Sequence, residues 1–346
     1  MFYNAAMALD RDLSVAFVRA AFPEGPGDRR AWEMLAATGA RGLRIAHETR
    51  RFADVLLTER VPAAVAVARA NADALGLFGV RVEAADASVL AAPAAFDYVD
   101  LDPFGSPAPF LPAALAALRP GGVLAITATD MMVLAGVQRG AAERRYGSTP
   151  VRGRLGPEGG LRLLIAYVAR EAARRGSGVR PLLCYLHDHH VRLHVRVAPA
   201  DPTDAPPPVA RIDPGTWTGP DLGLAGAAGP FWLGPLFDPA LTDRLVAPEP
   251  AARPREAARL IAAFREEARV PAPFYYEPNR LAGGLGLAEP PAPDAFVAAL
   301  RQAGYAAART HARAGAFRTL APRSAVEDAA RRLAGIGHSQ NERVRA

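Results

Sequence analysis

Short apolar runs alternate with amphipathic or Ala-rich stretches along the first 200 residues, the pattern of strands followed by helices. The predicted strands lie at 31–37, 54–59, 80–84, 96–102 and 123–128. The predicted helices lie at about 1–20, 42–51, 61–75, 109–118 and 160–175, and an extended stretch follows at 182–197. Strands and helices that alternate at this spacing predict an α/β fold with a parallel, doubly wound sheet.

The pattern changes after this region. Residues 198–230 are rich in Pro and Gly and predict an irregular insertion. Beyond residue 241 we expect a smaller α+β unit, with helices at 255–269 and 293–303 and a hairpin over 305–320. That unit is consistent with a winged-helix nucleic-acid module and equally with any other small α+β domain. We therefore predict two domains, 1–240 and 241–346.

Composition excludes several classes of protein. Half of the 346 residues are hydrophobic, which is too many for a disordered chain. The single cysteine, Cys184, excludes a disulfide framework and a Cys-rich zinc site. No apolar run reaches the roughly 18 residues of a membrane helix, and the first residues do not resemble a secretion signal. A cytoplasmic protein without a membrane or protein partner is the expectation.

The charge favours a nucleic-acid partner. All 41 basic residues are Arg, against 35 acidic residues, for a net charge of +6. Residues 241–346 carry 16 Arg and 11 acidic residues, so the positive excess is concentrated there. Arg binds phosphate in a bidentate manner and stacks on bases. A GC-rich gene would also encode its basic residues as Arg, so composition alone leaves both explanations open.

Ligand-suited residues follow three successive predicted strands. The turn at 38–42 contains Gly39, where an α/β nucleotide site places its glycine loop, although the full G-x-G-x-x-G pattern is missing. Glu59 ends the second strand, at the position from which an acid binds ribose hydroxyls. Asp86 follows the third strand and could accept a hydrogen bond from an adenine amine. These residues predict a nucleoside site at the sheet edge.

The string D-L-D-P-F-G-S-P at 100–107 follows the fourth predicted strand and carries the most specific chemistry. Its prolines and glycine fix a loop that would direct Asp102 and Phe104 into the crevice. An exocyclic base amine is a poor nucleophile because its lone pair is delocalised, and a carboxylate that accepts its N–H localises that pair. Phe104 could hold the base by stacking. The alternative is a rigid turn in which Asp102 caps the next helix.

Histidines cluster at 187–194. On an extended segment, His187 and His189 would share one face and could bind a metal. Polar residues facing solvent or the rim of the site explain the pattern better, and no metal is expected.

Seven strings together resemble the tRNA (guanine-26, N2) dimethyltransferases. They are F-Y-N at 2–4, M-A-L-D-R-D at 7–12, A-T-G-A-R-G at 37–42, D-L-D-P-F-G-S-P at 100–107, T-A-T-D at 127–130, G-P-F-W-L-G-P-L at 229–236 and G-Y-A-A-A-R-T-H at 304–311. The resemblance implies a Rossmann-like class I methyltransferase domain that uses S-adenosylmethionine, followed by a smaller tRNA-binding domain.

The resemblance also assigns roles to individual residues. Asp102 would be the catalytic acceptor, and Phe104 with Phe2 would clamp the guanine. The residues that would hold the cofactor are Arg11 and Arg41 at the methionine carboxylate, Glu59 at the ribose, and Asp86 with the backbone of Ala87 at the adenine. The family usually has Asp where this chain has Glu59. Arginines on the predicted hairpin, namely Arg309, Arg313 and Arg318, are expected to contact tRNA phosphates.

Two other functions remain open on the sequence. An amino-methyltransferase that acts on another RNA or DNA base would need the same Asp-Pro-Phe loop. An RNA-binding protein on a lapsed methyltransferase scaffold would have no reason to keep Arg41, Glu59 and Asp102 together.

Overall fold

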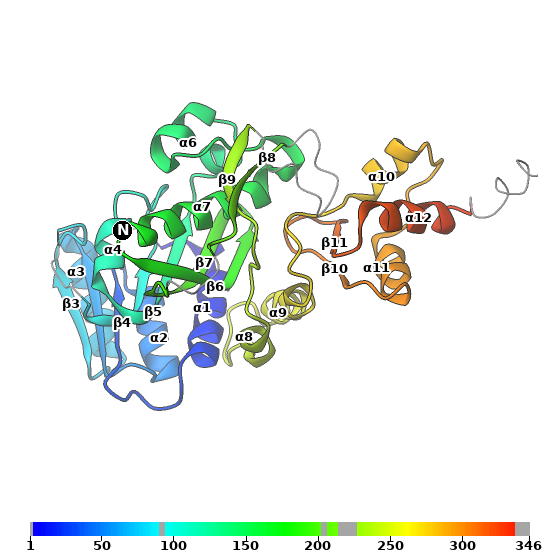
Figure 1. Cartoon of the computed structure of the whole chain (residues 1–346). Helices are drawn as coiled ribbons and strands as arrows, with labels where there is room; N and C mark the ends of the chain where they lie inside the picture. Colours follow the sequence, from blue (N-terminus) through cyan, green and yellow to red (C-terminus); the bar gives the residue numbers. More distant parts are fainter. Residues whose placement is uncertain (1–2, 90–93, 202–205, 214–226, 336–346) are drawn as a thin grey trace, which may run out of the picture.

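A seven-stranded sheet forms the centre of the protein (Figure 1). The computed structural model describes residues 3–89, 94–201, 206–213 and 227–335. The strand order is β3-β2-β1-β4-β5-β7-β6. The strands are β1 Arg30–Glu33, β2 Asp54–Glu59, β3 Val80–Ala84, β4 Phe96–Leu101, β5 Leu118–Ala128, β6 Ser177–His187 and β7 His190–Pro199. The first five are parallel, while β7 runs antiparallel to both β5 and β6. The predicted Rossmann-like α/β fold is confirmed.

Helices cover both faces of this sheet. The first group, in which neighbours contact one another, is α1 Ala8–Ala21, α2 Ala40–Thr49 and α3 Pro62–Ala74. A second group packs on the long helix α7 Gly156–Ala173 and comprises α4 Leu111–Ala117, α5 Met131–Leu134 and α6 Arg139–Tyr146. Figure 1 shows α1 and α2 on one side of the sheet and α7 on the other. None of the helices in the described ranges is long and apolar enough to cross a membrane.

Two parts of the chain differ from the expectation. The stretch 182–197 was expected to be one extended segment, but it contains the turn of a hairpin: β6 ends at His187, Asp188 has a φ of 47°, and β7 begins at His190. The irregular insertion also contains structure, because β8 Val209–Ile212 pairs with β9 Ala228–Trp232. Pro and Gly obscured that pairing in the sequence, because they usually mark loops.

The smaller C-terminal unit has its own hydrophobic core. It contains α10 Pro278–Leu285, α11 Pro293–Gln302, α12 Arg323–Leu333 and the hairpin of β10 Ala307–Arg309 with β11 Phe317–Thr319. The predicted hairpin is confirmed, and Phe317 stacks on Phe296 at its centre. The helices α8 Pro239–Arg244 and α9 Pro254–Ala268 instead pack into the first core, which extends to Tyr275. Ala316 of the hairpin also belongs to this first core, so the two cores meet at the hairpin, and the division into domains at residue 241 stays a prediction.

Buried charges join the two units. Arg318 of β11 is 2% exposed, and its Nη2 lies 3.1 Å from a carboxylate oxygen of Glu158 on α7 and 2.5 Å from one of Glu267 on α9. Burial alone would raise the pKa of Glu267, but Arg318 and His311 outweigh it and lower that pKa to about 2. Arg318 thus stabilises the charged form of Glu267 and also contacts the buried side chain of Glu158.

Replacing Arg318 should destabilise the protein. Arg318→Met leaves Glu158 and Glu267 without their shared partner, so we expect the free energy of unfolding to fall by about 3–5 kcal/mol, the cost of breaking a buried ion pair. The control is Arg323→Met, which removes an exposed pair with Glu327 and should cost less than about 1 kcal/mol. Urea unfolding of both variants measures the difference. Equal effects of the two substitutions would contradict a structural role for Arg318.

Candidate active site

The order of the strands places three acidic residues and the glycine turn at one edge of the sheet. The strands β3, β2, β1 and β4 are neighbours in that order and parallel, so their carboxyl ends lie in a row. Asp86 follows β3, Glu59 ends β2, the glycine turn follows β1, and Asp102 follows β4. Ligands of open α/β sheets bind outside the carboxyl ends of the strands. The structure therefore brings together the residues that the sequence assigned to a nucleoside site.

Glu59 is fixed by the turn beside it. One of its carboxylate oxygens accepts a hydrogen bond from the amide of Ala37 at 2.9 Å, and the other accepts from Val61 at 2.8 Å. Gly39, the residue directly before α2, has a φ of 74°, a conformation that favours glycine. Because each carboxylate oxygen can accept two hydrogen bonds, Glu59 is held in place and still has capacity for ligand hydroxyls.

Asp86 lies one strand further along the edge. It accepts hydrogen bonds from the hydroxyl and the amide of Ser88, at 2.6 and 2.9 Å. These bonds lower the pKa of Asp86, so the carboxylate is charged. Ala87 beside it is buried at 1% exposure and can contribute only its backbone to a ligand.

The loop after β4 is tied to the loop after β5. The amide of Gly105 donates to Thr129 Oγ1 at 2.8 Å, and the amide of Thr129 donates to the Gly105 carbonyl at 3.0 Å. Tyr146 donates to Asp130 at 2.8 Å, and its hydroxyl lies 2.7 Å from the Ser106 hydroxyl. Two strings noted in the sequence, at 100–107 and 127–130, thus form one rigid structure, from which Phe104 projects with 80% exposure.

Asp102 contacts a buried arginine. Its Oδ2 lies 2.7 Å from Nη2 of Arg41, the second residue of α2. Arg41 is 4% exposed and also pairs with Asp10 at 2.7 Å and with Asp100 at 3.5 Å. Arg41 therefore lies beneath the site and links Asp102 to the interior.

A second buried arginine completes this cluster, and sequence analysis missed it. Arg192 of β7 contacts both oxygens of Asp100, at 2.9 and 2.6 Å. Burial would raise the pKa of Asp100, but Arg192 and Arg41 lower it to about 2. The signal in the sequence was Arg192 itself, because a charged residue inside an apolar strand requires a buried partner.

Glu33 at the end of β1 is also buried. It accepts a hydrogen bond from the amide of Gly42 at 2.9 Å. Burial, and then the charge of Asp100, raise the pKa of Glu33 to about 8, although Arg41 acts in the opposite direction. At neutral pH this side chain is mostly an uncharged acid.

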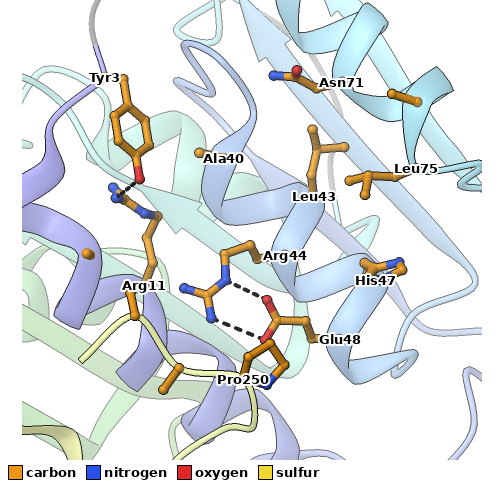
Figure 2. Close-up of a pocket in the computed structure, with 14 residues that line it drawn as sticks. Tyr3, Arg11, Ala40, Leu43, Arg44, His47, Glu48, Asn71, Leu75 and Pro250 are labelled. Carbon is orange, nitrogen blue, oxygen red and sulfur yellow. Dashed lines mark hydrogen bonds and ion pairs between the residues drawn. The ribbon is translucent and has the colours of Figure 1, made fainter. Parts of the chain in front are cut away.

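Arg11 on α1 is mostly buried, at 7% exposure. It lines a cavity of about 670 Å³ between the N-terminal segment, α2, α3 and the loop at 250–252. Figure 2 shows its guanidinium at the hydroxyl of Tyr3, a contact of 2.8 Å, with Asn71 of α3 and Leu75, the residue after α3, on the opposite side of the cavity. A contact between Arg11 and the cofactor stays a prediction, and Phe2 lies outside the described residues.

The three hairpin arginines differ in exposure. Arg309 pairs with Asp294 at 2.9 Å and Arg313 with Glu277 at 3.1 Å, both at the surface. The expectation for Arg318 is wrong, because this side chain is buried and its charge is neutralised by Glu158 and Glu267. Adjacent positions on β11 point to opposite faces, and the sequence did not show which face packs on α7.

The histidines do not form a metal site in the described part of the chain. His187 and His190 flank the β6–β7 turn, so the expected shared face of His187 and His189 is wrong. His194 is buried, and burial lowers its pKa to about 3. Within the described ranges, no group of three His, Cys, Asp or Glu side chains is arranged to hold a metal ion.

Known proteins are similar to this chain in sequence and in fold. The family described as "TRM: N2,N2-dimethylguanosine tRNA methyltransferase" matches residues 1–203 and 222–331. The chain belongs to this family. A tRNA (guanine(26)-N(2))-dimethyltransferase from Methanosphaerula palustris is 36% identical over 94% of this chain and 90% of its own length. A protein of the same name from Thermococcus kodakarensis is 35% identical over 93% of this chain and 90% of its own length.

A solved structure agrees with the fold. Trm1 from Pyrococcus horikoshii in complex with S-adenosyl-L-methionine superposes with a TM-score of 0.86, at 29% identity, over 95% of this chain and 94% of that one. The residues at the sheet edge of the present chain fit the same cofactor. Ribose hydroxyls and an adenine amine donate hydrogen bonds, and the chain offers two acceptors: Glu59, which is held in place by two backbone amides, and Asp86, which is charged.

The raised pKa of Glu33 makes stability depend on pH. In the unfolded chain this carboxyl ionises near its ordinary value of 4.5, while the folded protein retains the proton up to about pH 8. The folded state therefore binds more protons in this window, and the free energy of unfolding contributed by Glu33 falls as pH rises through it. Glu33→Gln, which cannot ionise, should gain stability relative to the wild type between pH 5 and pH 8.5.

Urea unfolding of the two proteins across this range measures the effect. The matched control is Glu143→Gln, an exposed acid whose pKa is lowered, so its ionisation is complete below this window. A difference between Glu33→Gln and wild type that is the same at every pH would contradict the prediction.

Proposed function

We propose that this protein is an S-adenosylmethionine-dependent tRNA (guanine(26)-N2)-dimethyltransferase in which Asp102 is the catalytic acceptor. Full-length relatives of that name support the reaction. The observation that supports the residue assignment is the position of Asp102 at the end of β4, in the row of strand ends that contains Glu59 and Asp86. A cytoplasmic location is part of the proposal and rests on the tRNA substrate.

The chemistry follows from the target amine. S-adenosylmethionine, when bound, supplies an electrophilic methyl group. Asp102 accepts a hydrogen bond from the guanine N2 amine, which localises the nitrogen lone pair as the new N–C bond forms. Its negative charge offsets the positive charge that develops on nitrogen, and the carboxylate can take the released proton. Phe104, which is exposed on the rigid loop, stacks on the guanine ring.

The tRNA backbone is bound by the C-terminal unit in this proposal. Arg309 and Arg313 are exposed, and their carboxylate partners are Asp294 and Glu277. Both guanidinium groups can exchange these partners for phosphates, while Arg309 is also held by the carbonyl of Ala316. Arg313 shares Glu277 with Arg154 of the first unit, which leaves one carboxylate between two guanidinium groups. That excess of positive charge favours a phosphate nearby.

Removing Asp102 should slow catalysis and preserve binding. For Asp102→Ala we expect kcat to fall by about 10²–10⁴-fold, the range for a positioned acid–base group, with a smaller loss for Asp102→Asn. The measurement is incubation of unmodified tRNA with labelled cofactor, followed by nucleoside analysis for N2-methylguanosine and N2,N2-dimethylguanosine. Asp328→Ala, an exposed carboxylate on α12, is the control. Near-normal turnover by Asp102→Ala would exclude this role.

Removing hairpin arginines should change the salt dependence of tRNA binding. For Arg309→Ala and for Arg313→Ala we expect the slope of log K against log salt concentration to become shallower by about 1 for each lost phosphate contact. Affinity for S-adenosylmethionine should stay unchanged. Arg323→Ala, at an exposed position of α12, serves as the control. Slopes equal to that of the wild type would place the phosphates on another surface.

A further inference from the structure

The helix α6 ends beside the loop that carries Asp102 and Phe104. Its last residue, Tyr146, is buried, and the Tyr146 hydroxyl lies 2.7 Å from that of Ser106 and donates to Oδ2 of Asp130 at 2.8 Å. Burial and the charge of Asp130 raise the pKa of Tyr146, so its hydroxyl keeps the proton that it donates. The end of α6 is therefore fixed relative to the loop of the candidate site.

The residue before Tyr146, Arg145, is an exposed arginine held at this place. Its Nη1 lies 2.7 Å from Oδ2 of Asp130; the side chain of Asp130 is 9% exposed, and that of Arg145 is 40% exposed. Within the described residues Arg145 makes no other hydrogen bond or ion pair, so its Nε and Nη2 are available to a ligand. Because Asp130 already restricts the side chain, a ligand that binds Arg145 costs less side-chain entropy than at a freely moving arginine.

Arg145 lies at the same edge of the sheet as Asp102. Asp102 directly follows β4, and Asp130 follows β5, the neighbouring parallel strand, in which Ile126 pairs with Leu101. Neighbouring strands lie about 4.8 Å apart. A nucleotide whose base lies at Asp102 therefore has its backbone in the vicinity of the Arg145 guanidinium.

The segment around Arg145 is strongly basic. Residues 139–154 contain five arginines and one acidic residue, Glu143. Glu143 pairs with Arg139 at 2.9 Å, whereas Arg144 is exposed and has no hydrogen bond or ion pair within the described residues. The last turn of α6 thus presents two adjacent arginines, of which only one is paired with a carboxylate. An excess of positive charge of this kind attracts the phosphates of a nucleic acid.

We propose that Arg145 binds a backbone phosphate next to the target guanine. This inference rests on the proposed function. A stacked base must be extruded before an enzyme can modify it, and unstacking is unfavourable. A phosphate held beside the catalytic loop opposes the return of the base to the stack. Asp130 and Tyr146 connect Arg145 to that loop, so one rigid structure binds both the phosphate and the base.

Neutral phosphates in the substrate test this inference. Two tRNAs are assembled by ligation, each with one methylphosphonate, which carries no negative charge, either 5′ or 3′ of the target guanine. For the wild type, one of the two should lower kcat/KM by about 10–100-fold, the scale of a hydrogen bond between charged groups. Arg145→Gln should lower kcat/KM for tRNA with natural phosphates by a similar factor.

The combination separates phosphate binding from a structural role of Arg145. In Arg145→Gln, the same methylphosphonate should lower kcat/KM by less than about twofold further, because the charge that recognises the phosphate is gone. Losses that multiply, or a wild type that tolerates both methylphosphonates, would overturn the inference. If the wild type does not methylate tRNA with natural phosphates, or Asp102→Ala keeps its turnover, the proposed function itself fails, so the two failures are distinguishable.

The matched control is Arg174→Gln. Arg174 is 71% exposed and pairs with Glu171, but it precedes β6, which runs in the same direction as β5, so it lies at the opposite edge of the sheet. This variant should respond to each methylphosphonate as the wild type does, and a response like that of Arg145→Gln would overturn the inference.

A second variant covers a failure of Arg145→Gln to fold. Arg145→Lys then replaces it, since Lys keeps the positive charge but not the guanidinium fork that matches a phosphate. The loss caused by the methylphosphonate should be smaller in Arg145→Lys than in the wild type. An equal loss in the two proteins would overturn the inference.

Discussion

The ion pair between Arg41 and Asp102 connects the site to the packing of the whole first unit. An unpaired charge in the interior costs several kcal/mol, so Arg41 can be buried only where carboxylates surround it. Those carboxylates come from α1 and β4, and the second arginine that balances them comes from β7. The cluster is therefore satisfied only when α1, α2, β4 and β7 are all in place. The position of Asp102 therefore depends on the packing of these four elements as well as on its own loop.

The elements and the row of strand ends could be predicted from the sequence because they depend on local periodicity. Glu59 and Asp102 end predicted strands, and parallel strands end at the same edge of a sheet. The buried ion pair between Arg192 and Asp100 could not be predicted in this way, because the two residues lie 92 positions apart and no periodic pattern relates them. Arg318 illustrates the same limit: its hairpin was predicted, but its burial depends on Glu158, which lies 160 residues earlier.

Buried ion pairs connect the two units, as they do around Asp102. Arg318 and Arg162 share the buried carboxylate of Glu158, and Arg318 also donates to the carbonyl of Ala272 at 2.8 Å. Directional bonds of this kind fix an orientation, whereas apolar contacts tolerate sliding. Under the proposed function this orientation matters, because it sets how far Arg309 and Arg313 of the hairpin lie from Asp102.

The uncharged form of Glu33 fits this account of the site. Arg41 and Arg192 already contact the carboxylates of Asp10, Asp100 and Asp102, and a further ionised acid beside them would add an unfavourable buried negative charge. Burial and Asp100 raise the pKa of Glu33 to about 8, so the protein keeps a proton there instead. Asp102, at 26% exposure, is the most accessible carboxylate of this group. In the proposed reaction, a carboxylate at this position offsets the positive charge that develops on the amine.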